Sequence, residues 1–82
     1  MYYTYVIQSE KDGSYYIGST SDLPKRLARH NEGREKYTSK HIPYKLVYSR
    51  QFDSRSEAMA YEYHIKKQKS RKFIEELIAQ NM

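Results

Sequence analysis

The sequence predicts an α+β domain: a small three-stranded antiparallel sheet flanked by helices, in the order β-β-α-β-α-α. Three observations lead to this prediction. Strand-type residues alternate around a tight turn near the N-terminus, a third strand-like segment covers 44–52, and two later segments repeat their apolar residues with helical period. The 82 residues are expected to form one domain, 1–82, with a thin core.

The N-terminal residues predict a β-hairpin. Tyr3, Tyr5 and Ile7 alternate with Thr4, Val6 and Gln8 in strand-favouring residues, and Asp12-Gly13 is a strong turn signal. Residues 14–18 then read as the returning strand. We expect Gly18 to end this strand.

A short helix is predicted after the hairpin. Ser21 or Asp22 suits its N-cap, and Pro24 is tolerated in the first turn. The helix should stop near Asn31 or Gly33, because either residue accepts a left-handed backbone conformation.

The rest of the chain predicts a loop, a strand and two helices. Polar residues 34–43 read as a surface loop, and 44–52 as a strand with Leu46 and Tyr48 on one side. Ser54-Arg55-Ser56-Glu57 fits a capping box before a helix, and Ser70 could cap the last one. The first of these helices is expected to align Ala58, Tyr61, Glu62, Ile65 and Lys69; the second has the apolar face Phe73, Ile74, Leu77 and Ile78.

Composition limits the function classes. The absence of cysteine excludes disulfides, cysteine-based zinc sites and a thiol nucleophile. The net charge of +5 and pI of about 9.4 favour an anionic partner such as nucleic acid, although a generic basic surface is an open alternative. No apolar run reaches the ~18 residues of a membrane span and no signal peptide opens the chain, so we expect a cytoplasmic protein.

Two tyrosines of the hairpin are candidates for proton transfer. Tyr5 and Tyr16 should lie opposite or diagonal to one another on paired strands. Two close phenols near cations could have one pKa lowered, which would make that phenol a usable base. The alternative is an aromatic pair that only fills the core.

Arg26 and His30 are the second candidate pair, since residues four apart project together from a helix. Arginine can hold a phosphate with a planar fork of donors, and histidine can relay a proton near neutral pH. A solvated basic helix face is the alternative, because Lys25 and Arg29 are on the same helix.

Glu62 is a candidate metal ligand. A carboxylate beside an apolar helix face is costly unless it is paired or binds a cation, and one carboxylate with waters and phosphate oxygens is an ordinary Mg²⁺ arrangement. The alternative is a salt bridge to Lys66, four residues on, or to an arginine.

A basic run near the C-terminus could follow a nucleic-acid backbone, or could simply be a solvated face. It comprises Lys66, Lys67, Lys69, Arg71 and Lys72. His41 and His64 lack metal-type partner spacing and are read as surface residues.

Taken in order, these residues resemble the GIY-YIG nuclease superfamily over nearly the whole chain. The match comprises Tyr5 of the first motif, Tyr16-Ile17-Gly18 of the second, the helix arginine Arg26, His30, and Glu62 at the metal-binding glutamate. The segment Lys45-Leu46-Val47-Tyr48 looks most like the small stand-alone bacterial branch. Only the tyrosine of the first motif remains in Tyr3-Thr4-Tyr5. A late asparagine found in some members cannot be placed, since Asn81 is nearly at the terminus.

The resemblance implies metal-dependent hydrolysis of a DNA phosphodiester, with a place in repair or recombination of branched or damaged DNA. In that reading Glu62 holds one Mg²⁺ or Mn²⁺, and Tyr16 or Tyr5 deprotonates or positions the attacking water. His30 accepts or relays the proton, and Arg26 stabilises charge on phosphorus.

Further residues are expected to contact the DNA backbone. These are Gly18, Ser19, Lys25 and Arg29, together with the basic run. The alternative function is a module of the same fold that binds nucleic acid without cutting it. We expect a monomer whose target specificity a separate protein partner could supply.

Overall fold

The computed structural model describes residues 1–80, so Asn81 lies outside the described residues. The predicted order of elements is confirmed, with one short 3₁₀ helix added. The elements are β1 (Tyr2–Ser9), β2 (Tyr15–Thr20), α1 (Leu23–Asn31), η1 (Thr38–His41), β3 (Tyr44–Phe52), α2 (Arg55–Lys67) and α3 (Arg71–Gln80). Within residues 1–80, no helix combines the length and apolar character needed to cross a bilayer.

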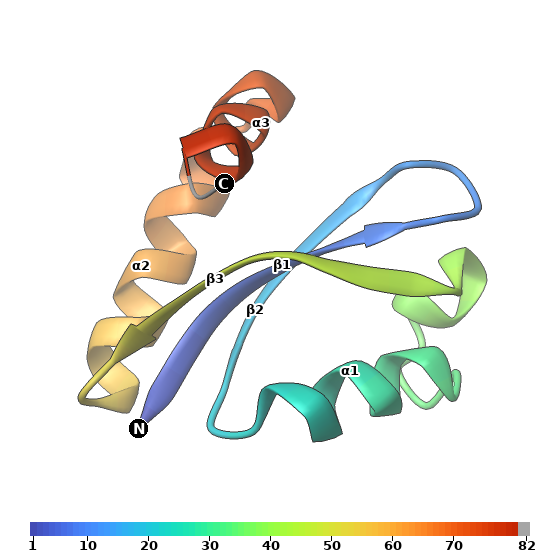
Figure 1. The fold of residues 1–82 in the computed structure, drawn as a ribbon, viewed down its shortest axis with the longest axis horizontal. Helices are drawn as coiled ribbons and strands as arrows, with labels where there is room; N and C mark the ends of the chain where they lie inside the picture. Colours follow the sequence, from blue (N-terminus) through green and yellow to red (C-terminus); the bar gives the residue numbers. More distant parts are fainter. Residues whose placement is uncertain (81–82) are drawn as a thin grey trace.

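The sheet is antiparallel with the strand order β2-β1-β3, so β1 is the central strand. Helix α1 covers one face, and α2 and α3 lie on the other side (Figure 1). Because both faces of β1 are covered, four consecutive side chains from Thr4 to Ile7 are buried. The third strand therefore joins the hairpin at its first strand, which the sequence did not specify.

Two apolar clusters lie on the two faces of the sheet. The cluster beside α2 and α3 contains the buried residues Val6, Tyr48, Ile65 and Ile74. The cluster on the α1 side contains the buried residues Tyr5, Ile7 and Tyr44. Adjacent residues of β1 thus serve opposite clusters, as strand pleating requires.

Strand β2 is longer than predicted. It continues through Gly18 to Thr20, so the expectation that Gly18 ends the strand is wrong. Gly18 pairs with Tyr5, and Gly13 in the preceding turn has φ of 79°, a conformation that glycine adopts without strain. The continued pairing places Ser19 and Gly18 on opposite faces of the sheet.

Strand β3 contains a bulge that the sequence pattern did not reveal. Val6 pairs with Tyr48 but the next residue, Ile7, pairs with Leu46, which leaves Val47 as the extra residue. Leu46 and Tyr48 therefore lie on opposite faces, and their predicted placement on one side is wrong.

Helix α1 has the predicted ends. The Asp22 side chain accepts a hydrogen bond from the backbone N–H of Lys25 at 3.1 Å, and the helix ends at Asn31. Gly33, with φ of 77°, follows. The Asn31 amide then bonds both the N–H and the C=O of Tyr44, at 2.6 and 3.1 Å, and so holds the end of α1 against β3.

Segment 34–43 is more ordered than a surface loop. It contains η1, whose Thr38 is fully buried and is hydrogen-bonded to the side chain of His30 in α1. The predicted surface loop therefore differs from expectation in one 3₁₀ turn and one buried residue.

The last two helices begin at the predicted caps. The Ser54 hydroxyl accepts from the backbone N–H of Glu57 at 3.2 Å, and the Ser70 hydroxyl accepts from Phe73 N–H at 3.1 Å. Helix α2 ends at Lys67, and Lys69 lies in the junction before α3 with φ of 49°. The expectation that Lys69 continues the helical stripe is therefore wrong.

Candidate active site

Tyr5 and His30 form a buried pair at the centre of the α1 side. The Tyr5 hydroxyl lies 3.0 Å from His30 Nε2, and the two residues are 1% and 0% exposed. The phenol crosses directly over Gly18, where an added Cβ would lie 2.5 Å from the hydroxyl oxygen. The glycine thus makes room for the tyrosine that reaches the histidine.

The second ring nitrogen of His30 is also bonded. Nδ1 lies 2.9 Å from the Thr38 hydroxyl, which itself donates to the Glu35 carbonyl at 3.5 Å. Burial lowers the pKa of His30, so the ring is neutral at neutral pH. Nδ1–H then donates a hydrogen bond to the Thr38 hydroxyl, and Nε2 accepts a hydrogen bond from the Tyr5 hydroxyl. The hydrogen-bond network assigns this tautomer.

Tyr16 lies against the same imidazole without bonding it. Its ring meets His30 edge-on, with centroids 5.0 Å apart, and it is diagonal to Tyr5 across the hairpin. Burial raises the pKa of Tyr5 and outweighs the opposite influence of Arg26, so the expected lowering does not occur at Tyr5. Tyr5 is therefore a protonated phenol that donates to a neutral histidine.

Arg26 projects from α1 beside this pair. One of its terminal nitrogens lies 3.2 Å from Glu35, which also pairs with Arg29 at 3.7 Å. The Arg26 Nε–H is buried and lacks an acceptor within residues 1–80. A buried donor without a partner is costly. The Arg26 side chain as a whole is 30% exposed, and this exposed part is what an anionic ligand can reach. Sequence reasoning missed Glu35, which carries no motif.

Glu62 projects from α2 on the other side of the sheet. Its carboxylate accepts hydrogen bonds from the Ser19 hydroxyl and from Lys66 Nζ, the latter at 2.6 Å. The salt bridge to Lys66 that was the alternative reading of Glu62 is therefore present. The carboxylate is not sealed by it, because the Glu62 side chain is 21% exposed.

Arg26 and Glu62 line one cavity, although their helices cover opposite faces of the sheet. This cavity, about 280 Å³, also contains Tyr2, Ser19, Thr20, Ser21, Arg55 and Met59. A neighbouring cavity of about 260 Å³ shares Arg26 and adds Lys25 and Arg29. The two cavities share Thr20 and Ser21 and together form a charged cleft at the C-terminal end of the edge strand β2.

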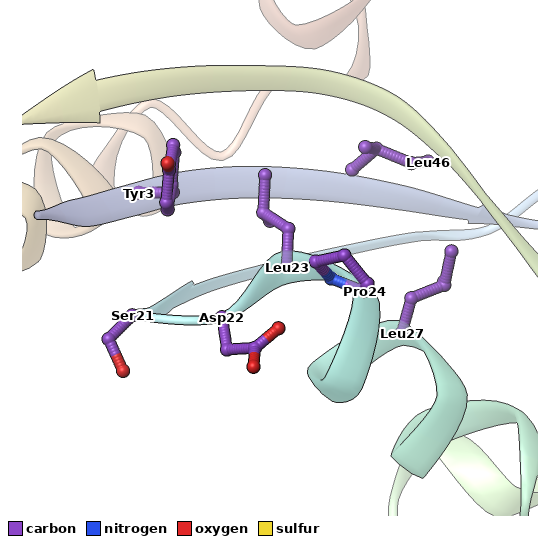
Figure 2. A pocket seen from close by; sticks show the side chains of 7 residues that line it. All are labelled: Tyr3, Ser21, Asp22, Leu23, Pro24, Leu27 and Leu46. Carbon is purple, nitrogen blue, oxygen red and sulfur yellow. The ribbon is translucent and has the colours of Figure 1, made fainter.

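A larger cavity lies between α1 and the sheet and has a different character. Its volume is about 610 Å³, and Tyr3, Leu23, Pro24, Leu27 and Leu46 give it mainly apolar walls. Figure 2 shows Leu23 and Leu27 pointing toward the strands, with the Ser21 and Asp22 side chains at the rim. Of the predicted catalytic side chains, Arg26 and Glu62 line the charged cleft, and none lines this larger cavity.

The acidic side chains of the cleft decide whether it can hold a divalent metal. Within residues 1–80, no three histidine, cysteine or acidic side chains lie close enough together to hold a metal ion. Glu62 alone suits Mg²⁺ or Mn²⁺, which accept one carboxylate when waters and substrate phosphate oxygens complete the shell. Lys66 is half exposed and can withdraw its ammonium group from Glu62.

The basic run is exposed throughout, as expected of a surface. Arg71 stacks on the Tyr15 ring at 4.7 Å and donates to the Gly13 carbonyl at 3.1 Å, which ties α3 to the hairpin. His64 is also on the surface and stacks on Tyr61, with centroids 6.1 Å apart.

The amino-acid sequence matches a known family over most of its length. The model of a family described as the GIY-YIG catalytic domain covers residues 1–75. The chain belongs to the GIY-YIG family. Membership confirms the resemblance seen in the motifs and places the chain in a nuclease superfamily with DNA as the implied substrate.

Two UPF0213 proteins are similar to the chain in sequence. It is 46% identical over 80 residues to a UPF0213 protein of Streptococcus pneumoniae, covering 96% of this chain and 79% of that one. A UPF0213 protein of Halobacterium salinarum is 48% identical over 67 residues, covering 80% and 86%.

A UPF0213 protein from Bacillus halodurans, solved by NMR in solution, has the same fold. It superposes with a TM-score of 0.61 at 38% identity, covering 98% of this chain and 85% of that chain. The predicted fold class and the small stand-alone branch of the GIY-YIG family are thereby confirmed.

Proposed function

We propose that this protein is a metal-dependent endonuclease that hydrolyses DNA phosphodiester bonds in the cleft between Arg26 and Glu62. One observation carries the proposal: a guanidinium from α1 and a carboxylate from α2 line the same open cavity. The buried Tyr5–His30 pair is tied to its walls through the chain, since His30 follows Arg26 by one turn of α1 and Tyr5 pairs with Gly18, the neighbour of Ser19. Action on branched or damaged DNA in the cytoplasm is part of this proposal.

Glu62 would hold one Mg²⁺ or Mn²⁺ in this mechanism. When bound, the ion would supply Lewis-acid stabilisation of charge on the phosphate and the leaving group. The Ser19 hydroxyl orients the carboxylate through its hydrogen bond, and Lys66 withdraws. Ser19 thus acts through Glu62, whereas the sequence suggested a direct phosphate contact.

The proton of the attacking water passes along the Tyr5–His30 bond. The Tyr5 oxygen accepts this proton while its own proton moves to the neutral His30 Nε2, 3.0 Å away. The hydroxide attacks phosphorus, and the opposite P–O bond breaks as the leaving oxygen takes a proton from solvent. Tyr16, partly exposed beside the same ring, positions the water.

Arg26 stabilises the negative charge that develops on phosphorus. Its side chain is 30% exposed and lines the cavity together with Glu62, so the guanidinium can donate to a phosphate oxygen there. Lys25 and Arg29 extend the positive charge into the adjoining cavity and bind neighbouring phosphates. Gly18 contributes indirectly by accommodating Tyr5.

The basic run extends the contact surface in this proposal, through Lys66, Lys67, Lys69, Arg71 and Lys72. A protein partner that supplies target specificity, and a monomeric state, belong to the same proposal. A non-catalytic DNA-binding module is the competing function, and the Glu62–Lys66 pair favours it, because this pair satisfies the carboxylate without a metal.

The test is cleavage of supercoiled and branched DNA in Mg²⁺ and in Mn²⁺. Glu62→Gln and Arg26→Gln should each lower the rate by about 10²–10³, the usual effect of removing a group that stabilises transition-state charge. Glu76→Gln and Arg34→Gln, which change exposed residues away from the cleft, serve as matched controls. Cleavage by the Glu62 and Arg26 variants at the wild-type rate would refute the catalytic roles. Salt-dependent binding without any metal-dependent product would favour the binding module.

A further inference from the structure

A second candidate binding surface lies on the segment that the sequence suggested was a plain loop. Four residues, Lys36, Tyr37, Lys40 and His41, line a cavity of about 520 Å³. Tyr37 is 68% exposed, and unlike the equally exposed Tyr63 it shares a cavity with two lysines.

The Tyr37 ring continues a line of aromatic rings that starts at the candidate active site. His30 lies 5.0 Å from Tyr16, Tyr16 lies 6.1 Å from Tyr37, and Tyr37 lies 5.9 Å from His41, measured between ring centroids. The exposed face of Tyr37 is therefore one ring away from Tyr16, which we have placed beside the attacking water.

The charge around this ring favours an anion. Lys36 and Lys40 are both exposed at the cavity. Two acidic side chains beside this segment are already paired. Asp12 lies 2.6 Å from His41, and Glu35 pairs with Arg26 and Arg29. An exposed aromatic face between two lysines is the combination by which proteins bind single-stranded nucleic acid.

We propose that an unpaired nucleobase of the substrate stacks on Tyr37, while Lys36 and Lys40 contact the flanking phosphates. In an intact duplex each base face is covered by its neighbours, so only an unpaired or splayed base can reach this ring. This inference rests on the proposed nuclease function and specifies its substrate: DNA with a single-stranded segment next to the cleavage position.

The experiment measures binding of a fluorescent single-stranded oligonucleotide by anisotropy in EDTA, where cleavage is absent. Tyr37→Ala should weaken binding about 5- to 150-fold, the range expected for losing one stacked base. Tyr37→Phe should bind like wild type, because stacking needs only the ring. Tyr63→Ala is the matched control: Tyr63 is also 68% exposed but lies on α2, outside this cavity. It should bind like wild type.

The two lysines are tested by salt dependence. Lys36→Gln with Lys40→Gln should lower the slope of log affinity against log salt by about 1.4, since each phosphate contact to a single strand contributes about 0.7. Tyr37 and both lysines are exposed, so these substitutions leave the fold intact, which a thermal unfolding curve checks.

The outcomes separate this inference from the proposed function. Tyr37→Ala binding as tightly as wild type, equal losses for Tyr37→Ala and Tyr63→Ala, or no binding of single strands by wild type would each overturn the inference. It would stand, and the nuclease proposal would fail, if binding depended on Tyr37 while the wild-type protein gave no metal-dependent cleavage product.

Discussion

Replacing Gly18 with alanine should separate the Tyr5–His30 pair. The added Cβ would lie 2.5, 2.7 and 3.0 Å from the hydroxyl oxygen, Cζ and Cε1 of Tyr5, all too close for real contacts. The ring is 1% exposed and has no room to withdraw. Overpacking of this kind costs about 1–3 kcal/mol, and an unpaired buried nitrogen on His30 costs about 1–3 kcal/mol more.

Urea unfolding measures this change. The expected loss is about 2–6 kcal/mol, which lowers the melting temperature of a domain of this size by about 10 °C or more. A double-mutant cycle with Tyr5→Leu isolates the cause, because without the phenol the Gly18→Ala substitution should be nearly neutral. A Gly18→Ala variant as stable as wild type, or an equal cost in both backgrounds, would show that Tyr5 does not require the glycine.

Three further predictions follow from buried polar groups. Burial lowers the pKa of His30, so as pH decreases the unfolded chain binds a proton before the folded chain does. The free energy of unfolding should therefore fall below about pH 6.5, by up to ~1.4 kcal/mol per pH unit. In urea titrations, His30→Gln should flatten this pH dependence. Burial and the Tyr61 hydroxyl, 2.9 Å away, raise the pKa of Tyr48 to about 12, so an absorbance titration should lose one of the phenols that ionise late, at strongly alkaline pH, in Tyr48→Phe. Asn31→Ala removes both hydrogen bonds to the Tyr44 backbone and should cost about 1–3 kcal/mol in the same unfolding assay; an unchanged midpoint would show that the clamp is dispensable.

Local chemistry made much of the fold predictable from sequence. The turn at Gly13, the Asp22 and Ser54 caps and the strand 44–52 depend on neighbours within a few residues, and each was predicted. The β3 bulge was not, because it is visible only when the strand pairs with β1. A bulge residue such as Val47 looks like any other strand residue.

The candidate site divides in the same way. Tyr5 and His30 could be proposed from motif order, but their burial and direct bond depend on a glycine opposite and on helix packing. Thr38 and Glu35 lie in a polar stretch without any pattern, and only the folded chain shows that they support His30 and Arg26. Residues that hold functional groups in place are therefore harder to predict than the groups themselves.

The alternation of β2 links the two halves of the cleft. Gly18 faces α1 and gives Tyr5 its space, while the next residue, Ser19, faces α2 and holds Glu62. Shifting this strand by a single residue would exchange the two, placing a hydroxymethyl group under the phenol and leaving the carboxylate without its donor. One dipeptide in one edge strand thus sets the spacing between an arginine and a glutamate on opposite sides of the sheet. An insertion in the hairpin turn would be tolerated only if it left that register unchanged.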